Sequence, residues 1–335
     1  MKITLADIAQ KANVSKMTVS RVLSGKGQVA KETYDRVMKI VEEFGYQPNW
    51  LARGLASKRS MIIGVIIPKI EHMFLDNYIT QVLTGVVDIA VENNYRIMLC
   101  PVETKPHGNS EYLNVARTKL LDGMILLKTK VNDPNIETLA NAGFPFVLVN
   151  HKKYSKKYNF VDSKNIQGAK LAMEYLYQHG HRKIAFVSGS LDETNGKDRL
   201  KGYIESLERF GLLFKEEWVV YGDFNKNKAY RFSEKLFLDK KKMPTAIFCA
   251  DDYMAIGVMQ RIKEIGLRVP EDIAVIGFDD IELAAYVKPA LTTIRQPIYE
   301  LGKTSTQILL NLINDKQKTP VHRLLDVELI KRESA

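Results

Sequence analysis

The stretch VSKMTVSRVL, residues 14–23, offers one helical face for packing and another for a charged partner. Ser15 can begin the helix, because serine favours the N-cap position. Apolar side chains then recur at the i, i+3 and i+4 spacing of one face: Val19, Val22 and Leu23. The opposite face carries Lys16, Met17, Ser20 and Arg21. This division predicts a helix that packs on one side and touches an anionic, groove-shaped partner on the other.

Two further helices are expected around this one. Upstream, Thr4 and Asp7 have the spacing of a capping box, and apolar residues follow at helical spacing: Leu5, Ile8, Ala9 and Ala12. Downstream, a helix is expected from about residue 31 to 44, before Gly45, with this apolar stripe: Tyr34, Val37, Ile40, Val41 and Phe44. Two short helices joined by a tight turn predict a helix-turn-helix, whose second helix enters the major groove of DNA. A bundle without a ligand would leave the basic face unexplained.

Positive charge is concentrated in the same region. The chain has a net charge of +10, and residues 1–60 hold eleven Lys and Arg against five acids, which leaves +4 for the other 275 residues. A basic segment ahead of a nearly balanced body is typical of a nucleic-acid-binding head on a soluble module. A merely solvated basic surface is the alternative.

Composition excludes several other classes. The 335 residues are 45% hydrophobic and 26% charged, as in an ordinary soluble chain of two or three domains. We see no signal peptide or membrane span and expect a cytoplasmic protein. Cys100 and Cys249 lie in apolar segments, so we interpret them as buried thiols rather than as a disulfide or a metal site. Neither a cofactor nor a metal is expected.

From residue 61 onward, short apolar runs alternate with amphipathic helical stretches. The runs are 61–68, 96–102, 123–127, 145–150, 183–189, 218–223, 245–250 and 273–278. This alternation predicts parallel sheets built from βαβ units, and the two sets of runs predict two similar subdomains. We interpret residues 150–162 and the string PALTTIRQP, residues 289–297, as polar crossovers. Because ligands bind beyond the carboxyl ends of parallel strands, the polar residues at those ends are candidates for a site: Asn150, Asp251, Asp252 and Asp279.

Strings along nearly the whole chain resemble the lactose/galactose-repressor family of bacterial transcription regulators. They are TLADIAQKANVSKMTVSRVLSG, FGYQPNWLARGLASKRS, IIGVIIP, GHRKIAFVSG, DRLKGY, PTAIFCADDYMAIGVM, GLRVPEDIAVIGFDD and LTTIRQP. The resemblance implies an all-α helix-turn-helix headpiece, then an α/β periplasmic-binding-protein-like body of two doubly wound subdomains. The implied boundaries are 1–46 for the headpiece, 47–60 for a hinge helix and 61–335 for the effector-binding and dimerisation domain. Within that domain, the N-subdomain would hold about 61–160 and 292–320, and the C-subdomain about 162–290 and 322–335.

The resemblance also implies which residues contact DNA. Lys16, Met17 and Arg21 would face base edges, since arginine can fork onto guanine and methionine can touch a thymine methyl. Phosphate contacts would come from the hydroxyls of Thr4, Ser15, Thr18 and Ser20. Hinge contacts in the minor groove would come from Asn49, Ala52 and Leu55, with Leu55 as the wedge between base pairs. Ala30 departs from the family, which often caps the third helix with serine, and the expected cost is on the order of 1 kcal/mol.

Seven residues are candidates for the effector site. Arg199 and Gln296 match the family's pocket, Asn150, Asp251 and Asp279 come from the strand ends, and Phe74 and Phe224 could offer apolar faces to a ring. We interpret Asp252 instead as the cap of the following helix. Two acids facing one arginine would repel a phosphate, so we expect a neutral sugar or oligosaccharide as the effector. A purine or nucleoside corepressor and control by a partner protein remain alternatives.

We therefore expect a DNA-binding transcription regulator, most simply a repressor, that acts as a homodimer on a palindromic operator without contacting a membrane. Its effector would change operator affinity by favouring one of two conformations. No catalytic residues can be placed, so an enzyme is not expected. A sugar-acting enzyme and a solute-binding protein are the remaining hypotheses from other classes.

Overall fold

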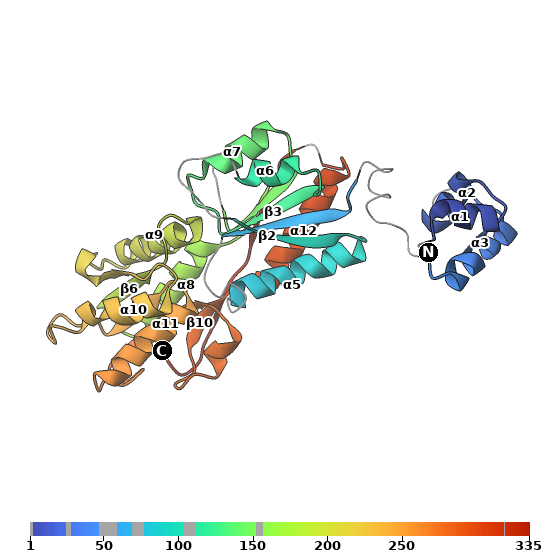
Figure 1. Ribbon diagram of the computed structural model, residues 1–335. Coiled ribbons are helices and arrows are strands. Elements are labelled where there is room, and N and C mark those ends of the chain that lie inside the picture. Colours follow the sequence, from blue (N-terminus) through green and yellow to red (C-terminus); the bar gives the residue numbers. More distant parts are fainter. Residues whose placement is uncertain are drawn as a thin grey trace. The chain divides into compact units, whose positions relative to one another are not determined.

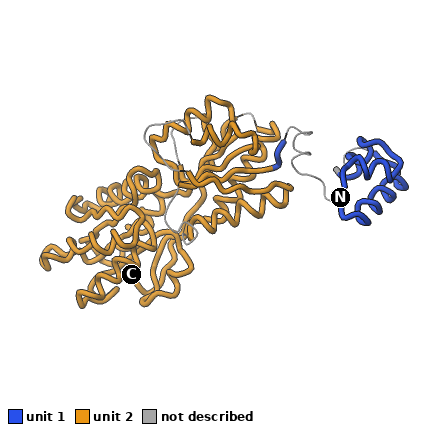
Figure 2. The backbone as a smooth tube through the Cα atoms, in the orientation of Figure 1, with its two compact units in different colours: residues 1–61 blue, residues 62–335 orange. Residues whose placement is uncertain are grey.

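A computed structural model describes residues 3–24, 28–46, 59–68, 77–102, 111–151, 157–317 and 319–335. The chain divides into two compact units, residues 1–61 and residues 62–335 (Figure 2). Most of the expected hinge, residues 47–58, lies outside the described residues, so its boundaries stay a prediction. None of the described helices is long and apolar enough to cross a membrane.

The first unit contains the expected helices: α1 (Leu5–Lys11), α2 (Lys16–Ser24) and α3 (Lys31–Glu43). Thr4 and Asp7 form the capping box of α1, and the Oγ of Ser15 accepts the N–H of Thr18 at 3.0 Å. The buried core of this unit is Ile8, Ala9, Ala12, Val19, Val22 and Val37. Gly45 follows α3 with φ +57, the left-handed conformation that lets glycine end a helix.

Two side chains of the predicted α3 stripe are not part of that core. Tyr34 is 44% exposed and Phe44 is 38% exposed, so the interpretation of both as core residues was wrong. Three short helices enclose a small core, and residues at the margins of an apolar stripe stay at its surface. Phe44 instead lies under the ammonium group of Lys11, whose Nζ is 4.3 Å from the ring centroid.

The second unit holds two six-stranded sheets among its described residues (Figure 1). The first sheet has the order β11-β5-β4-β3-β1-β2, and its paired strands are parallel. Its strands are β1 (Ile62–Pro68), β2 (Arg96–Val102), β3 (Gly123–Leu127), β4 (Phe146–Val149), β5 (Phe160–Ser163) and β11 (His322–Leu325). Its helices are α5 (Asn77–Glu92), α6 (Glu111–Arg117), α7 (Pro134–Asn141) and α12 (Ile298–Ile313). The α6–α7 pair and the α5–α12 pair cover opposite faces, which makes the sheet doubly wound.

The second sheet has the order β12-β10-β9-β8-β6-β7 and is parallel except for β12, which is antiparallel to β10. Its strands are β6 (Ile184–Ser188), β7 (Val219–Tyr221), β8 (Ala246–Cys249), β9 (Ala274–Asp279), β10 (Thr292–Arg295) and β12 (Glu328–Ile330). Its α-helices are α8 (Asn165–Gln178), α9 (Thr194–Arg209), α10 (Lys226–Phe232) and α11 (Asp252–Glu264). Three short 3-10 helices, Glu216–Trp218, Ser233–Leu236 and Glu282–Ala285, complete the described elements of this half.

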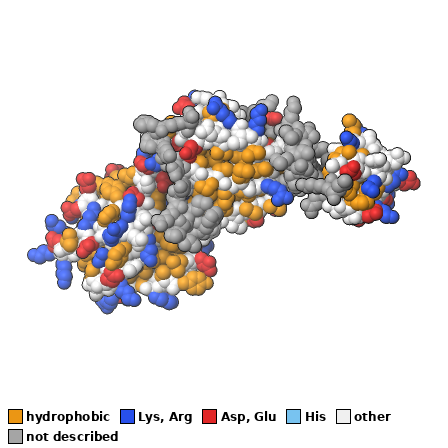
Figure 3. Space-filling model, in the orientation of Figure 1, with side chains coloured by type: hydrophobic (Ala, Val, Ile, Leu, Met, Phe, Trp, Pro, Cys, Tyr) orange, Lys and Arg blue, Asp and Glu red, His pale blue; other side chains and the backbone are white. Residues whose placement is uncertain are grey.

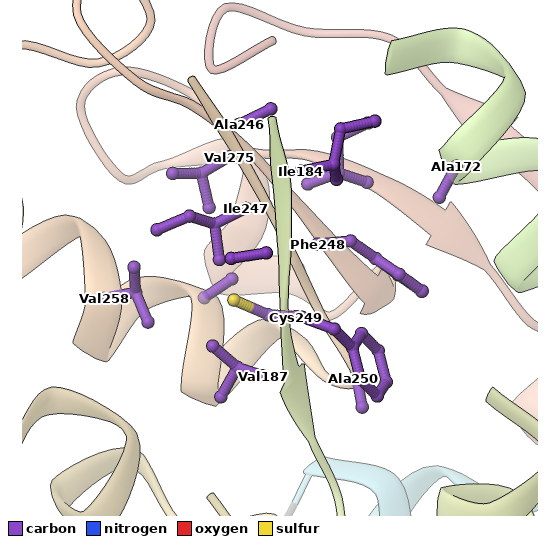
Figure 4. Packing of buried hydrophobic residues seen from close by; sticks show 14 of the residues in the cluster. Ala172, Ile184, Val187, Ala246, Ile247, Phe248, Cys249, Ala250, Val258 and Val275 are labelled. Atoms are coloured by element: carbon purple, nitrogen blue, oxygen red, sulfur yellow. The ribbon is translucent and has the colours of Figure 1, made fainter. Parts of the chain in front are cut away.

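All eight predicted apolar runs contain strands. Six of them are inner strands, which are apolar because parallel strands inside a sheet are buried on both faces, whereas β2 and β7 lie at the sheet edges. β8 shows the arrangement: Ile247 and Phe248 point to opposite sides of the strand, and both lie among apolar neighbours (Figure 4). Cys249 of the same strand is a buried free thiol, whereas Cys100 is partly buried. On the surface of this half, by contrast, Lys, Arg, Asp and Glu side chains are interspersed (Figure 3).

The two segments interpreted as crossovers contain strands instead. β5 and β10 each span four residues and include buried polar side chains, Asp162 and Ser163 in β5 and Thr292 and Thr293 in β10, so an apolar pattern does not reveal them. The implied subdomain boundaries near 290–292 and 320–322 are therefore early. β10 belongs to the second sheet and β11 to the first, so the described chain crosses between the sheets after β5, after β10 and after β11.

Ala30 supplies the first prediction, because it occupies the N-cap of α3 with φ −58 and ψ 139 and without a side-chain hydrogen bond. Ala30→Ser adds an oxygen that can accept an N–H of the first turn and should stabilise the headpiece by about 1 kcal/mol. Slower native-state hydrogen exchange of the α3 amides in the full chain would show the gain. Ala30→Val adds bulk without an oxygen and is the control. Equal gains in both variants would show that the hydroxyl is not the cause.

Candidate nucleic-acid interface and effector cavity

The face of α2 that the sequence assigns to DNA lies on the surface of the headpiece. The side chains of Lys16, Met17, Ser20 and Arg21 are exposed, and Met17 is 64% exposed, which is unusual for a large apolar residue. Val19 and Val22 of the same helix are buried. The helix therefore separates packing residues from accessible ones as its periodicity predicts.

Some of the predicted phosphate-binding hydroxyls also have structural roles. The hydroxyl of Thr4 donates to Oδ2 of Asp7 at 2.8 Å, and the hydroxyls of Ser15 and Thr18 are 2.9 Å apart and hydrogen-bonded. These groups hold the starts of α1 and α2, where N–H groups and the helix dipole already favour an anion. The predicted hinge contacts Asn49, Ala52 and Leu55 lie outside the described residues.

The second unit contains a cavity at the carboxyl ends of the strands of both sheets. It encloses about 480 Å³ of empty space, including its open mouth. Six of the seven predicted effector-binding residues line it: Asn150, Arg199, Phe224, Asp251, Asp279 and Gln296. The seventh, Phe74, lies outside the described residues. Three of the four residues that the strand-end rule singled out, Asn150, Asp251 and Asp279, thus lie in one place, and the fourth, Asp252, does not line the cavity.

Six further lining residues were not predicted: Tyr78, Lys128, Glu193, Asn195, Tyr253 and Ile281. Lys128 directly follows β3, so the strand-end rule would have found it. Tyr78 and Asn195 belong to the first turns of α5 and α9. No sequence pattern distinguishes those two from other helical residues, and only the fold brings them to the cavity.

Arg199 is the main cation on the second-sheet side of the cavity and is only 1% exposed. Its Nε donates to Oδ1 of Asn165 at 2.9 Å, and its Nη1 donates to the carbonyl of Ala250. Nη1 also lies 3.3 Å from Oδ1 of Asp279, and the guanidinium carbon is 3.6 Å from the centroid of the Phe278 ring. These contacts fix the plane of the guanidinium group before any ligand arrives.

Asp279 and Gln296 form a hydrogen-bonded pair beside Arg199. Nε2 of Gln296 donates to Oδ1 of Asp279 at 2.6 Å, and the hydroxyl of Ser163 donates to Oε1 of Gln296 at 2.8 Å. Ser163 ends β5 and Gln296 follows β10, so this chain of contacts joins two of the segments that cross between the sheets. The side-chain orientation at the cavity therefore depends on both halves of the unit.

Asp251 has a second role besides lining the cavity, and its neighbour Asp252 has a role different from the one expected. Asp251, which lines the cavity, is also the N-cap of α11, and its Oδ1 accepts the N–H of Met254 at 2.6 Å. Asp252 is fully buried and is not the cap, so that interpretation was wrong. Its carboxylate accepts the hydroxyl of Thr293 and the N–H of Ile281, and it thereby holds the loop after β9.

Phe224 provides an apolar surface in the cavity because Gly189 leaves room for its ring. A Cβ on Gly189 would lie 2.1 Å from Cζ of Phe224, so any larger residue would displace the ring. The guanidinium carbon of Arg199 lies 5.9 Å from the centroid of the Phe224 ring. The cavity thus combines an aromatic surface with charged and amide groups, as small-molecule sites commonly do.

Burial dominates the electrostatics of the carboxyl groups at the site. Burial, and then the charge of Asp279, raises the pKa of Asp251 to about 7. Burial also raises the pKa of Asp162 to about 7, and it raises the pKa of Asp252. Desolvation disfavours the charged form of each group and raises its pKa. Hydrogen bonds to these carboxyl groups lower the pKa but offset only part of that increase.

Two buried polar atoms on the cavity wall have no hydrogen-bond partner among the described residues. They are Nη2 of Arg199, a donor, and Oδ1 of Asn150, an acceptor. A buried polar atom without a partner costs roughly 1–3 kcal/mol, so a ligand that supplies both partners gains affinity from each. Asn150 also has a positive φ of 54°, a conformation that asparagine tolerates better than most residues.

Both the headpiece and the body match known protein families. Residues 4–49 match the bacterial regulatory proteins of the lacI family, and residues 173–335 match the periplasmic binding protein-like domain. Catabolite control protein A of Priestia megaterium is 36% identical over 315 residues, 94% of this chain and 93% of that protein. The HTH-type transcriptional repressor CytR of Escherichia coli is 34% identical over 332 residues, 99% of this chain and 96% of that protein.

Solved structures support the same assignment over the whole chain. The lac repressor dimer bound to operator and the anti-inducer ONPF superimposes with a TM-score of 0.88 at 28% identity, covering 100% of this chain and 99% of that one. A complex of the transcriptional regulator CelR with cellobiose gives 0.77 at 29% identity, covering 99% and 100%. The chain belongs to the lacI family of bacterial regulatory proteins. It is a transcription regulator and not an enzyme.

The raised pKa of Asp251 leads to a prediction about stability and pH. Between its usual pKa of 3.8 and the folded value of about 7, the folded chain holds a proton that the unfolded chain releases. The stability that this group contributes is therefore present below about pH 4 and is lost as the pH rises through about 7. Asp251→Asn removes the titration and keeps an oxygen for the N–H of Met254. The free energy of unfolding should fall less between about pH 5 and about pH 8 in this variant, by about 1.4 kcal/mol for each pH unit from about 5 up to about 7, where the folded group itself titrates.

Urea unfolding at several pH values measures this difference. The control is Asp239→Asn, which changes an exposed acid of the same unit. If the Asp251 variant and the wild type lost stability in parallel across this range, the carboxyl group of Asp251 would not hold a proton in the folded chain.

Proposed function

We propose that this regulator is a repressor that binds a palindromic operator as a homodimer in the cytoplasm, and that a small neutral sugar or oligosaccharide in the cavity controls its operator affinity. The exposed face of α2 supports the DNA-binding half of this proposal, and the unpaired polar atoms on the cavity wall support the effector half. The lac repressor structure bound to operator and the CelR structure bound to cellobiose are consistent with both halves.

The headpiece has the charge and the accessible groups that major-groove binding requires. Arg21 and Lys16 lie on the exposed face and can donate to guanine, while Met17 can contact a thymine methyl. Hydroxyls at the starts of α1 and α2 would position the headpiece on phosphates without reading sequence. The proposal keeps residues 47–60 as the hinge, with Asn49, Ala52 and Leu55 in the minor groove.

The chemistry of the cavity wall favours a neutral ligand with several hydroxyl groups. Nη2 of Arg199 needs an acceptor and Oδ1 of Asn150 needs a donor, and a hydroxyl can serve as either. The described wall residues include three carboxyl groups, on Glu193, Asp251 and Asp279, against the cations of Lys128 and Arg199. Lys128 and the raised pKa of Asp251 both weaken the charge argument against a phosphorylated ligand, so the preference for a neutral ligand rests on the two unpaired atoms.

A purine or nucleoside is the second candidate, because a flat ring could stack on Phe224. Several relatives are repressors named PurR, including one from Aliivibrio fischeri that is 35% identical over 315 residues, 93% of this chain and 92% of that protein. A purine would satisfy the two unpaired atoms through its ring nitrogens and exocyclic groups. Control by a partner protein remains the third possibility.

Binding at the cavity can change DNA affinity because residues from both halves of the unit form its wall. Lys128 and Asn150 follow strands of the first sheet, and Asp251 and Asp279 belong to the second. A ligand that contacts both sides favours the arrangement in which those contacts fit best. It shifts operator affinity only if it binds the two arrangements unequally.

The proposal that the headpiece binds operator DNA predicts the effect of changing Arg21. Arg21→Met should weaken binding to operator DNA by about 1–3 kcal/mol, because it removes the forked contact with a guanine. Fluorescence anisotropy with labelled DNA from the upstream region of the protein's own gene, repeated across salt concentrations, measures the loss. The matched control is Arg209→Met, which removes the same charge from an exposed position on α9. Equal losses in both variants would mean that Arg21 contributes only general charge.

The proposal that an effector binds in the cavity predicts a separate result for Asp279. Calorimetry with a panel of sugars and nucleobases should find a sugar that binds the wild type, and Asp279→Asn should weaken its binding at least tenfold (about 1.4 kcal/mol). Operator binding without effector should stay unchanged, because Asp279 belongs to the body. Binding of nucleobases alone would replace the sugar with the purine alternative, and loss of operator binding in this variant would contradict the division of labour.

A further inference from the structure

The loop that follows β9 holds two consecutive residues in left-handed backbone conformations. Asp279 has φ 115 and Asp280 has φ 57, and neither is glycine. Such conformations cost free energy in residues with a Cβ and persist only where the surroundings hold them. Asp279 is also the residue that contacts Arg199 and Gln296 at the cavity wall. The surroundings of Asp280 therefore decide how Asp279 is presented to a ligand.

Two arginines that do not line the cavity hold the Asp280 carboxylate. Nε of Arg295 and Nη2 of Arg332 each donate to one of its oxygens at 2.6 Å, and the Asp280 side chain is 7% exposed. Neither Asp280 nor these two arginines lines the cavity. The pair of charge-assisted hydrogen bonds thus fixes the carboxylate without contacting the ligand position.

Arg332 is the better anchored of the two arginines. Its backbone N–H donates to the hydroxyl of Thr292 at 3.0 Å, and its Nη1 donates to the carbonyl of Leu291 at 2.8 Å. Its side chain is 18% exposed, whereas that of Arg295 is 49% exposed and also contacts Glu328. Removing Arg332 would leave a nearly buried carboxylate with one partner fewer, which is costly in a low-dielectric site.

Ile281, the next residue of the loop, is held by Asp252 rather than by the arginines. The N–H of Ile281 donates to Oδ2 of Asp252 at 2.9 Å, and the Ile281 side chain is buried and lines the cavity. The loop is therefore fixed by Asp252 at Ile281 and by two arginines at Asp280. Asp279 lies directly before these two attachment points, and its backbone conformation depends on both.

We infer that Arg332 is a positioning residue for the effector site, which acts through the Asp280 carboxylate to hold Asp279 in the conformation that faces the ligand. This inference rests on the proposed function, because it assigns the ligand to the same cavity. It adds a residue that lies outside the cavity and follows β12, more than fifty positions after Asp279 in the chain.

The first test needs no ligand. Hydrogen exchange of the full chain, read by mass spectrometry, should show the amides of residues 279–283 exchanging at least about tenfold faster in Arg332→Met than in the wild type. Lys331→Met is the matched control, because it removes the same charge from the exposed neighbouring position, and it should leave that exchange unchanged. Arg332→Lys keeps one donor for Asp280 and should restore part of the protection. Unchanged exchange in Arg332→Met would overturn the inference.

The second test measures the consequence for binding. For a sugar or nucleobase that binds the wild type, calorimetry should show at least about tenfold weaker binding to Arg332→Met, with operator affinity in the absence of ligand unchanged. A purely structural role would instead lower the thermal midpoint and operator binding together, which would overturn the inference. Asp280→Asn, which keeps the shape of the side chain and removes its charge, should reproduce the result if Arg332→Met does not fold.

The two tests separate this inference from the proposed function. If no compound of either class binds the wild type, the proposed effector class fails, while hydrogen exchange at residues 279–283 still decides whether Arg332 holds the loop. If a compound binds the wild type and Arg332→Met equally well, the effector class stands and the positioning role is overturned.

Discussion

The burial of the Arg199 guanidinium group constrains the second-sheet half of the body at the cavity. A cation that is 1% exposed must have partners close by, because an uncompensated buried charge costs several kcal/mol. Those partners come from separate elements: Asn165 begins α8, Ala250 follows β8, and Asp279 ends β9. Satisfying one arginine therefore fixes the relative positions of a helix and two strand ends. The donor that remains, Nη2, has no hydrogen-bond partner among the described residues, and Arg199 lines the cavity.

In each of two pairs of adjacent aspartates, one residue lines the cavity and the other holds the loop after β9. In the first pair, Asp251 lines the cavity while Asp252 is buried and holds the loop after β9. In the second, Asp279 lines the cavity, while Asp280 does not line it and is held by Arg295 and Arg332. At each strand end, one carboxyl group is available to a ligand and its neighbour fixes the backbone. A ligand therefore meets acids whose positions are set before it arrives.

Much of the fold could be predicted from the sequence, because central parallel strands are continuous apolar runs. β5 and β10 were missed because they are short and bury polar side chains such as Asp162 and Thr293. Hydrogen bonds offset the cost of burying these groups: Asp162 accepts the N–H of Ser163, and Thr293 donates to Asp252. In the cavity, strand-end residues such as Asn150 could be predicted, and Lys128 could have been found by the same rule. Tyr78 and Asn195 could not, since they reach the cavity from helices whose placement only the folded chain determines.

The order of the strands also governs how the body can be assembled during synthesis. β5 ends at Ser163, yet its neighbour in the sheet is β11, which begins at His322. A ribosome must therefore add more than 150 further residues before one side of β5 is covered. Until then, the growing chain exposes a strand edge that can pair with other chains. The first sheet begins the body but is completed only when β11 has been added, shortly before β12 completes the second sheet. The time for which that edge stays exposed therefore depends on how quickly the second half of the body is synthesised.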